Sequence, residues 1–183
     1  MRNLVNIVLL IVFCSGMSSC EMIKGWFDVD FETTFSGDLN IDILESARKS
    51  TSNYTFQSTA PINPLEDDQV AEYQDNIKEV VITRILAEVL ELNRDSVVFM
   101  EGTTFSIVSG SNITEWSLGN DWTIVDTTEI RLLDLDGAYN QIEDMIEAQE
   151  EFNVGVSGIC SEAGVSLSLR ISIETQIAAE KLK

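Results

Sequence analysis

From Phe27 onward the chain alternates apolar and polar residues with a period of two, which is typical of β-strands with one buried face. In residues 27–35, valine, phenylalanine or threonine occupies every second position, alternating with Asp28, Asp30, Glu32 and Thr34. Residues 39–43 repeat this pattern with leucine and isoleucine. The Ser36-Gly37-Asp38 segment between the two runs predicts a turn, so we interpret the runs as a β-hairpin.

Further strands are predicted along most of the remaining chain. Tyr54 and Phe56 indicate a short strand before the proline-containing break at residues 61–64. The run at 80–92 is compatible with a helix or a strand, but its alternation favours a strand whose apolar row occupies every second position from Val81 to Val89. We expect a charged partner or a sheet edge near Arg84. The other predicted strands lie within residues 97–108, 113–118, 122–135, 152–160 and 165–177, the last two on either side of a turn at 161–164.

Two segments have helical spacing instead. Val70, Tyr73 and Ile77 recur every three or four residues behind an acidic stretch, which predicts a helix over 67–79. The apolar residues of 137–151 also recur at this spacing and predict an amphipathic helix with an acidic outer face. Many strand signals with two short helices predict a mainly β chain folded as a two-layer antiparallel β-sandwich.

The charge of the chain limits its partners. Its 31 acidic and 11 basic residues give a formal net charge of −20. Nucleic-acid binding needs lysine and arginine to displace counterions from phosphate, so we expect no nucleic-acid partner. The same charge opposes adsorption to anionic lipid headgroups, so a membrane contact would require an anchor.

The sequence contains no histidine, which removes the usual general base, the catalytic triads built on it and the commonest zinc ligand. Cys160 has no imidazole partner and is interpreted as a small buried apolar residue. No glycine-rich phosphate-binding loop occurs. We therefore predict that the protein is not an enzyme; a hydrolase using two carboxylates is a less favoured alternative.

One segment resembles part of a calcium-binding loop. Asp134, Asp136, Gly137 and Glu143 match the third, fifth, sixth and twelfth positions of the helix-loop-helix pattern, but Leu132 at the first position cannot ligate. The favoured interpretation is a strand that ends at Asp134, with Asp136 capping the following helix. A weak calcium site formed by Asp134, Asp136 and Glu143 remains as an alternative, and no other cofactor is predicted.

The three tryptophans raise a second binding alternative. Trp26, Trp116 and Trp122 offer aromatic faces that suit sugar rings, but they are widely separated in the sequence. Packing in the core is the favoured interpretation for Trp116 and Trp122.

The first residues have the features of an export signal. Arg2 precedes an apolar run at residues 4–13, and small residues follow from Ser15. Because a bilayer-spanning helix needs about 20 apolar residues, this run is too short to be one. Residues 1–19 are therefore predicted to be a signal peptide.

The end of this segment, Met17-Ser18-Ser19-Cys20, resembles the lipobox of bacterial lipoproteins, in which small residues precede a cysteine that is diacylated and exposed by signal peptidase II. It departs from the commonest pattern in having Met17 where leucine is usual and serine just before the cysteine. The resemblance covers residues 1–20. It implies that Cys20 carries the lipid, and Glu21 after it favours the outer membrane.

The mature chain is then expected to consist of a tether at 20–25 and a single β-sandwich domain at 26–183. Its order of elements is similar to small β-sandwich lipoproteins of bacterial envelopes, without a diagnostic motif. This resemblance implies a membrane-anchored, non-catalytic protein of the cell envelope with a structural or partner-binding role. Its expected partners are the lipid bilayer, through the acyl anchor on Cys20, and an envelope protein or glycan. A carbohydrate- or calcium-binding module is the alternative.

Overall fold

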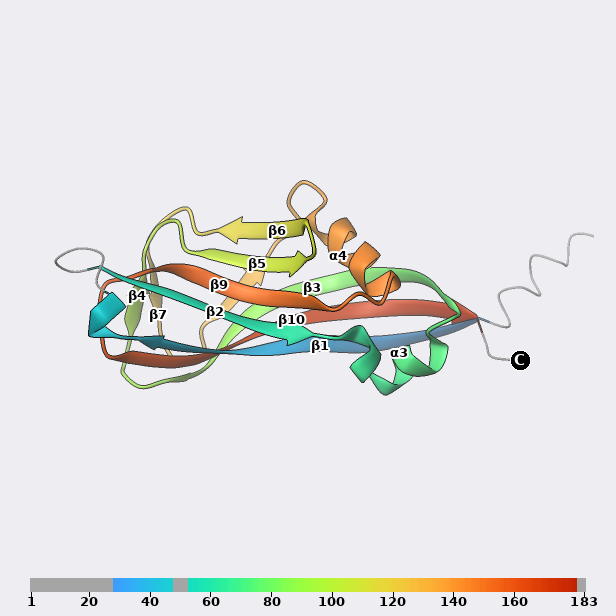
Figure 1. Ribbon diagram of the computed structural model, residues 1–183, viewed down its shortest axis with the longest axis horizontal. Helices are drawn as coiled ribbons and strands as arrows, with labels where there is room; N and C mark the ends of the chain where they lie inside the picture. Colours follow the sequence, from blue (N-terminus) through green and yellow to red (C-terminus); the bar gives the residue numbers. More distant parts are fainter. Residues whose placement is uncertain (1–27, 48–52, 181–183) are drawn as a thin grey trace, which may run out of the picture.

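The computed structural model of the protein describes residues 28–47 and 53–180. Most of this part of the chain is in β-strands, and Figure 1 shows that the longest strands run along the long axis of the molecule. The elements are β1 (Asp28–Ile43), η1 (Glu45–Ala47), β2 (Tyr54–Ile62), η2 (Pro64–Glu66), α3 (Asp68–Tyr73), β3 (Ile77–Leu92), β4 (Val97–Phe99), β5 (Thr104–Ser109), β6 (Asn112–Ser117), β7 (Trp122–Ile124), β8 (Glu129–Leu132), α4 (Ala138–Glu147), β9 (Phe152–Cys160) and β10 (Val165–Glu180).

The strands form two antiparallel sheets. The first sheet has the order β1-β10-β3-β8, and β10 pairs with both β1 and β3 over most of its length. The second sheet has the order β6-β5-β9-β4-β7, and β2 pairs with the other edge of β9. The sheets lie face to face, as Figure 1 shows. The predicted mainly β, two-layer antiparallel sandwich is therefore confirmed.

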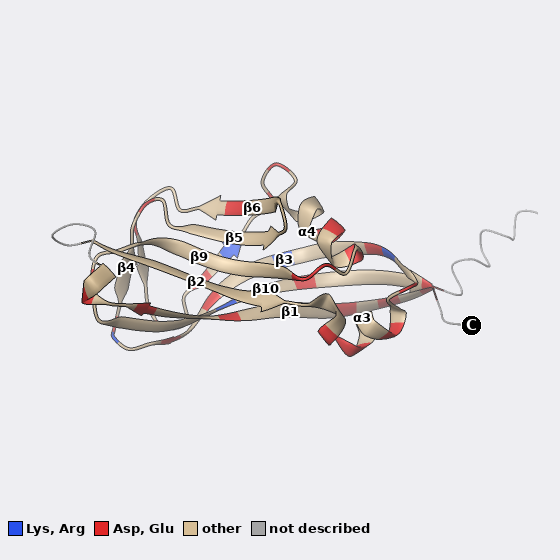
Figure 2. Ribbon diagram, viewed as in Figure 1, with Lys and Arg blue, Asp and Glu red and all other residues tan. Residues whose placement is uncertain are grey.

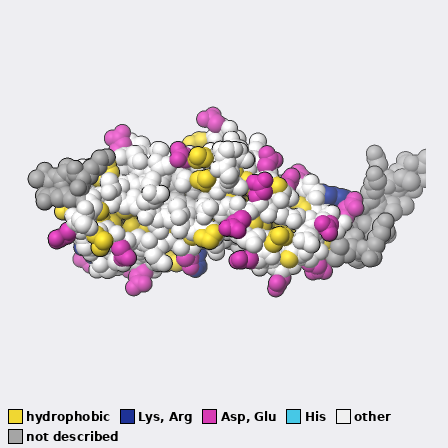
Figure 3. Space-filling model, in the orientation of Figure 1, with side chains coloured by type: hydrophobic (Ala, Val, Ile, Leu, Met, Phe, Trp, Pro, Cys, Tyr) yellow, Lys and Arg dark blue, Asp and Glu magenta, His cyan; other side chains and the backbone are white. Residues whose placement is uncertain are grey.

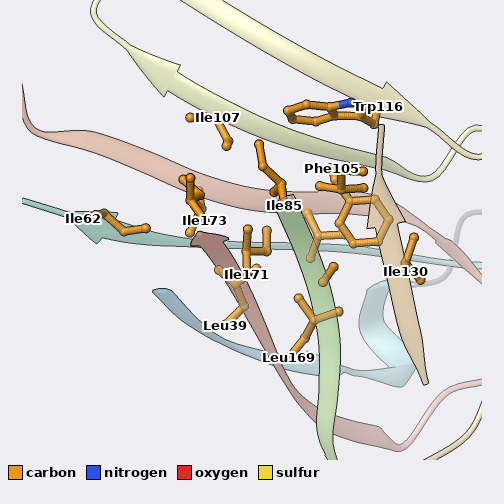
Figure 4. Close-up of a cluster of buried hydrophobic side chains, with 14 of the residues drawn as sticks. Leu39, Ile62, Ile85, Phe105, Ile107, Trp116, Ile130, Leu169, Ile171 and Ile173 are labelled. Carbon is orange, nitrogen blue, oxygen red and sulfur yellow. The ribbon is translucent and has the colours of Figure 1, made fainter. Parts of the chain in front are cut away.

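The core lies between the sheets, where the apolar rows of both meet. Alternation along each strand sends every second side chain inward, so the buried positions of β10 recur from Val165 to Ala179 with a period of two. Figure 4 shows side chains of both sheets converging on this layer. Fully buried members include Leu39, Ile85, Phe105, Ile107, Phe152, Leu169, Ile171 and Ile173.

The predicted hairpin at residues 27–43 is wrong, because β1 is one continuous strand of 16 residues. Gly37 stands at the same parity as Phe35 and Leu39, so the alternation passes through it unbroken, and Gly37 is buried. A Cβ atom at this position would lie 2.5 Å from Cγ2 of Val154 and 3.2 Å from Cβ of Ala60. Gly37 therefore allows the two sheets to approach closely; it does not make a turn.

The strands predicted at 152–160 and 165–177 are present as β9 and β10, but they belong to different sheets. The turn between them crosses the sandwich and is held by Arg94, whose Nη2 donates to the carbonyl oxygens of Ala163 and Gly164 at 3.2 and 3.0 Å. The N–H of Gly164 donates to the carbonyl of Ile43 at 2.7 Å. Hydrogen bonds with Arg94 and Ile43 thus hold this turn, and β9 and β10 do not pair with each other as a hairpin.

The helix predicted over 67–79 is much shorter. Asp67 caps α3 by accepting from the N–H groups of Gln69 and Val70, but the helix ends at Tyr73 and β3 begins at Ile77. The β-branched residues that follow pair with β10, so sheet formation overrides the helical spacing.

The strand predicted at 80–92 is confirmed as part of β3, and its predicted apolar row is right at Ile85, Ala87 and Val89 but wrong at Val81 and Thr83. Val80 and Ile82 face inward in the first half and Ile85 in the second, whereas Val81 is 43% exposed. The register with β10 shifts at this point, between Glu174 and Thr175. This bulge inserts one residue and exchanges the faces of β3, which simple alternation could not reveal.

The amphipathic helix predicted over 137–151 is present as α4, at residues Ala138–Glu147. Its predicted cap is wrong. Gly137, with φ of 77°, occupies the N-cap position, and no side chain caps the helix there. Asp134 takes over part of this role, since its Oδ1 accepts from the N–H of Tyr139 at 3.1 Å.

The close approach at Gly37 gives a testable prediction. Gly37→Val should lower the free energy of unfolding by about 1–3 kcal/mol, because the added side chain must displace the facing atoms of β9 and β2. Ser36→Val, on the exposed face of the same strand, should change it by less than about 0.5 kcal/mol. Urea denaturation of both variants measures the difference, and equal effects would contradict the packing role of Gly37.

Candidate functional site

The outer face of the first sheet is the most distinctive surface of the described chain. We use "outer face" for the side chains of β1, β10 and β3 that point away from the second sheet. Three hollows of about 670, 690 and 290 Å³ lie on it. Their outward-facing lining is almost entirely polar and comprises Asp30, Glu32, Thr34, Asn40, Asp42, Glu79, Val81, Thr83, Glu91, Ser166, Ser168, Glu174, Gln176 and Ala178.

Three basic side chains on this face are bound by carboxylates. Arg170 donates through Nε and Nη2 to the two carboxylate oxygens of Asp38 at 2.7 and 3.0 Å. The hydrogen bond from Arg170 lowers the pKa of Asp38, and the same bond raises the pKa of Arg170. Arg84 forms a two-pronged pair with Glu174, which confirms the charged partner expected near Arg84. Such exposed pairs contribute little to stability, but they neutralise the few cations of the face.

Lys78 completes this set with an ion pair to Asp28 at 2.6 Å and to Glu180 at 3.2 Å. By contrast, Asp30 and Glu79 have no ion pair within the described part of the chain. The outer face therefore keeps a net negative charge. Figure 2 shows acidic residues on β1 and on many other elements, and in Figure 3 most of the charged side chains on the visible face are acidic.

A different arrangement protects the opposite edge of this sheet. β8 pairs with β3 only at Ile85–Glu88, which leaves the first half of the β3 edge without a strand. There Glu143 Oε1 accepts from the N–H of Ile82 at 2.8 Å, and Glu147 Oε1 accepts from the N–H of Val80 at 2.9 Å. Residues four apart share one side of a helix, so α4 presents both carboxylates to the strand. The covering of the β3 edge by these glutamates was not predicted from the sequence, although their four-residue spacing could have indicated it.

The structure does not bring the predicted calcium ligands together. Glu143 is bound to the β3 backbone, Asp134 to the N–H of Tyr139, and Asp136 adopts a left-handed backbone conformation with φ of 55°. Across residues 28–47 and 53–180, no group of three or more acidic or cysteine side chains is placed to hold a metal ion. Asp134, Asp136 and Glu143 therefore do not form a ligand cluster in the described structure.

Neither tryptophan that the structure describes offers a sugar platform. Trp116 is only 7% exposed, and its Nε1 donates to the carbonyl oxygen of Leu133 at 2.7 Å. Trp122 is half-buried and packs against the core. Their predicted role in packing is thus confirmed, and Trp26 lies outside the described residues.

Cys160 lies in the part of the chain that the structure describes. Cys160 is fully buried, and this burial raises the pKa of its thiol, which confirms its interpretation as a buried apolar residue. Cys20, with the predicted signal peptide and tether, lies outside the described residues. None of the helices in the described part is long and apolar enough to cross a bilayer.

Comparison with known proteins identifies no family for this chain. No protein-family model matches the chain, and no curated protein matches its sequence. Among solved structures, the chain is similar to the decameric BFDV capsid protein, with 7% identity and a TM-score of 0.42 over 81% of this chain and 99% of that one. It is also similar to a structure of Desmodium yellow mottle tymovirus, with 8% identity and a TM-score of 0.36 over 85% and 91% of the two chains.

The two α4 carboxylates give a prediction for stability. Glu143→Ala should lower the free energy of unfolding by about 1–3 kcal/mol, because the N–H of Ile82 loses its acceptor. Alanine favours helix, so a loss would not arise from α4 itself. Denaturation and amide exchange at Ile82 measure the effect, and Glu143→Gln should lose less because it keeps an acceptor. Asp144→Ala, exposed on the same helix, is the matched control; an equal loss there would refute the edge contact.

Calcium gives a second prediction. Since Asp134, Asp136 and Glu143 do not converge, millimolar calcium should leave the melting temperature unchanged. Thermal melts with calcium and with magnesium at equal ionic strength test this expectation. A rise that is specific to calcium and absent in Asp134→Asn would show that the loop binds the ion after all.

Proposed function

We propose that this protein is a lipid-anchored, non-catalytic protein of the bacterial cell envelope, and that it binds a partner through the first sheet. The observation that carries the partner-binding role is the contrast between the two sides of this sheet. Its inner side is filled by the core, whereas its outer face is open, polar, hollowed and negatively charged. An open surface of this kind suits an extended partner better than an enclosed small molecule.

The position of β1 is compatible with an anchor on Cys20. Asp28 pairs with Glu180 at one end of the long axis, as seen at the right of Figure 1. Asp28 follows Cys20 by eight positions, so an acyl anchor would hold this end within about 28 Å of the bilayer. The long strands would then carry the outer face away from the membrane. Acyl chains on one cysteine hold a protein firmly, since each buried methylene contributes about 0.8 kcal/mol.

The chemistry of the described side chains favours a role without catalysis. Histidine is absent from the sequence, and the buried thiol of Cys160 has a raised pKa, which opposes formation of a nucleophilic thiolate. The carboxylates of the outer face lie around open hollows, where water surrounds them. A pair of acids working in hydrolysis would instead need one member shielded enough to stay protonated.

Mass spectrometry of the protein purified from bacterial membranes tests the anchor. The expected result is a mature chain that begins at Cys20 and carries acyl chains, with Cys20→Ala released from the membrane fraction. Cys14→Ala is the matched control, because Cys14 lies in the predicted signal peptide and its change should alter neither mass nor location. An unmodified native chain in the soluble fraction would contradict the proposal.

A further inference from the structure

The two edges of the first sheet are treated differently. At the β3 edge, Glu143 and Glu147 occupy backbone N–H groups, and β8 pairs with the next residues. At the other edge, β1 pairs with β10 through all 16 of its residues without a register shift. Within residues 28–47 and 53–180, no strand pairs with the far side of β1. One edge is thus closed and the other is available.

β1 also lacks the backbone interruptions that block an edge, although its acidic side chains oppose pairing with an identical chain. It contains no proline, no bulge and no lysine or arginine, whereas the neighbouring edge strand β2 carries Pro61. Helix α3 and its N-cap residue pack against inward-facing side chains of β1. Tyr73 contacts Phe31 with ring centroids 5.8 Å apart, and Thr33 Oγ1 donates to Asp67 at 2.5 Å. These two contacts use no backbone group of β1, so within residues 28–47 and 53–180 they leave its outer hydrogen-bonding edge open.

The charge of β1 indicates which strand would fit. All five of its charged residues are acidic and point to the outer face: Asp28, Asp30, Glu32, Asp38 and Asp42. A strand added beside β1 would place its own outward side chains next to these, where opposite charges stabilise the pair. The hollow lined by Asp30, Glu32 and Glu79 adjoins the same edge and gives long cationic side chains room to cross the face.

A second copy of this chain is a poor occupant of the edge. Pairing β1 with itself in antiparallel fashion would bring acidic residues together on the shared face. Each chain also carries a net charge of −20, so association would be opposed at long range. The charge therefore favours a basic partner.

We propose that the far edge of β1 receives an extended segment of an envelope partner with lysine or arginine at alternate positions, which adds to the first sheet as a further strand. Backbone hydrogen bonds would supply the affinity and the acidic row would select the partner. This inference rests on the partner-binding role proposed above. It names the element and the chemistry through which that role is carried out.

The test uses the full-length chain, purified in a neutral detergent, and a synthetic peptide that alternates lysine with valine and threonine. A second peptide has the same sequence but carries N-methyl groups on alternate amides, which keeps the charge and prevents strand pairing. We expect the first peptide to bind at least tenfold more tightly than the second, measured by fluorescence anisotropy. Amide exchange should slow along β1 when the first peptide is present.

Glu32→Lys, on the exposed row of β1, should weaken binding about threefold to tenfold. Glu115→Lys is the matched control, because it makes the same charge change at an exposed position of β6, an edge of the other sheet. It should bind like the unaltered chain. Equal weakening by both substitutions would mean that only overall charge matters and would overturn the proposal.

Three other results would also overturn it: no binding of the lysine peptide, equal binding of the N-methylated peptide, or protection of β1 that depends on protein concentration without peptide. The last would identify a second copy as the occupant. Acylation of Cys20 is measured separately, so loss of peptide binding in an acylated protein would remove the β1 proposal and leave the anchor standing. Peptide binding by a native chain that carries no acyl group would remove the anchor proposal and leave the β1 proposal standing.

Discussion

The first sheet depends on β10, which forms ladder hydrogen bonds on both of its edges. It pairs with β1 from Asp28 to Ile43 and with β3 from Ile77 to Leu92, so the first strand and a strand from the middle of the chain both pair with the last one. Its inward side chains, among them Leu169, Ile171 and Ile173, are fully buried between the sheets. Because one strand supplies both the pairing and much of the core, the assembly of the first sheet depends on β10.

The two edges of that sheet differ in whether their backbone N–H groups are covered. Unpaired N–H groups at an edge either bind water, are covered, or pair with another chain. At β3, carboxylates from α4 take these groups and close the edge. At β1, no described segment does so, and the protection against self-association is electrostatic. A row of acids repels identical chains while remaining attractive to a basic strand, which is consistent with the proposed partner.

The distribution of charge on the outer face also favours a basic partner. The cations Arg84, Arg170 and Lys78 are each held by a nearby carboxylate, so they do not offset the remaining acids of the outer face. A surface with this sign opposes contact with phosphate backbones and with anionic headgroups. Contact with a membrane would then come through lipid on Cys20, and contact with a partner through β1.

The sequence by itself determined the strand content, the inward and outward rows of most strands, the burial of Cys160 and Trp116, and the need of Arg84 for a charged partner. These depend on local alternation and on residue chemistry, which the sequence displays directly. Tertiary structure alone decided that Gly37 lies within a strand, that β9 and β10 separate into different sheets, that β3 exchanges its faces, and that Glu143 binds the backbone of β3. Each of those outcomes depends on a segment distant in the sequence, such as Val154 against Gly37 or Ile82 against Glu143, and local periodicity contains no information about which distant atoms will meet.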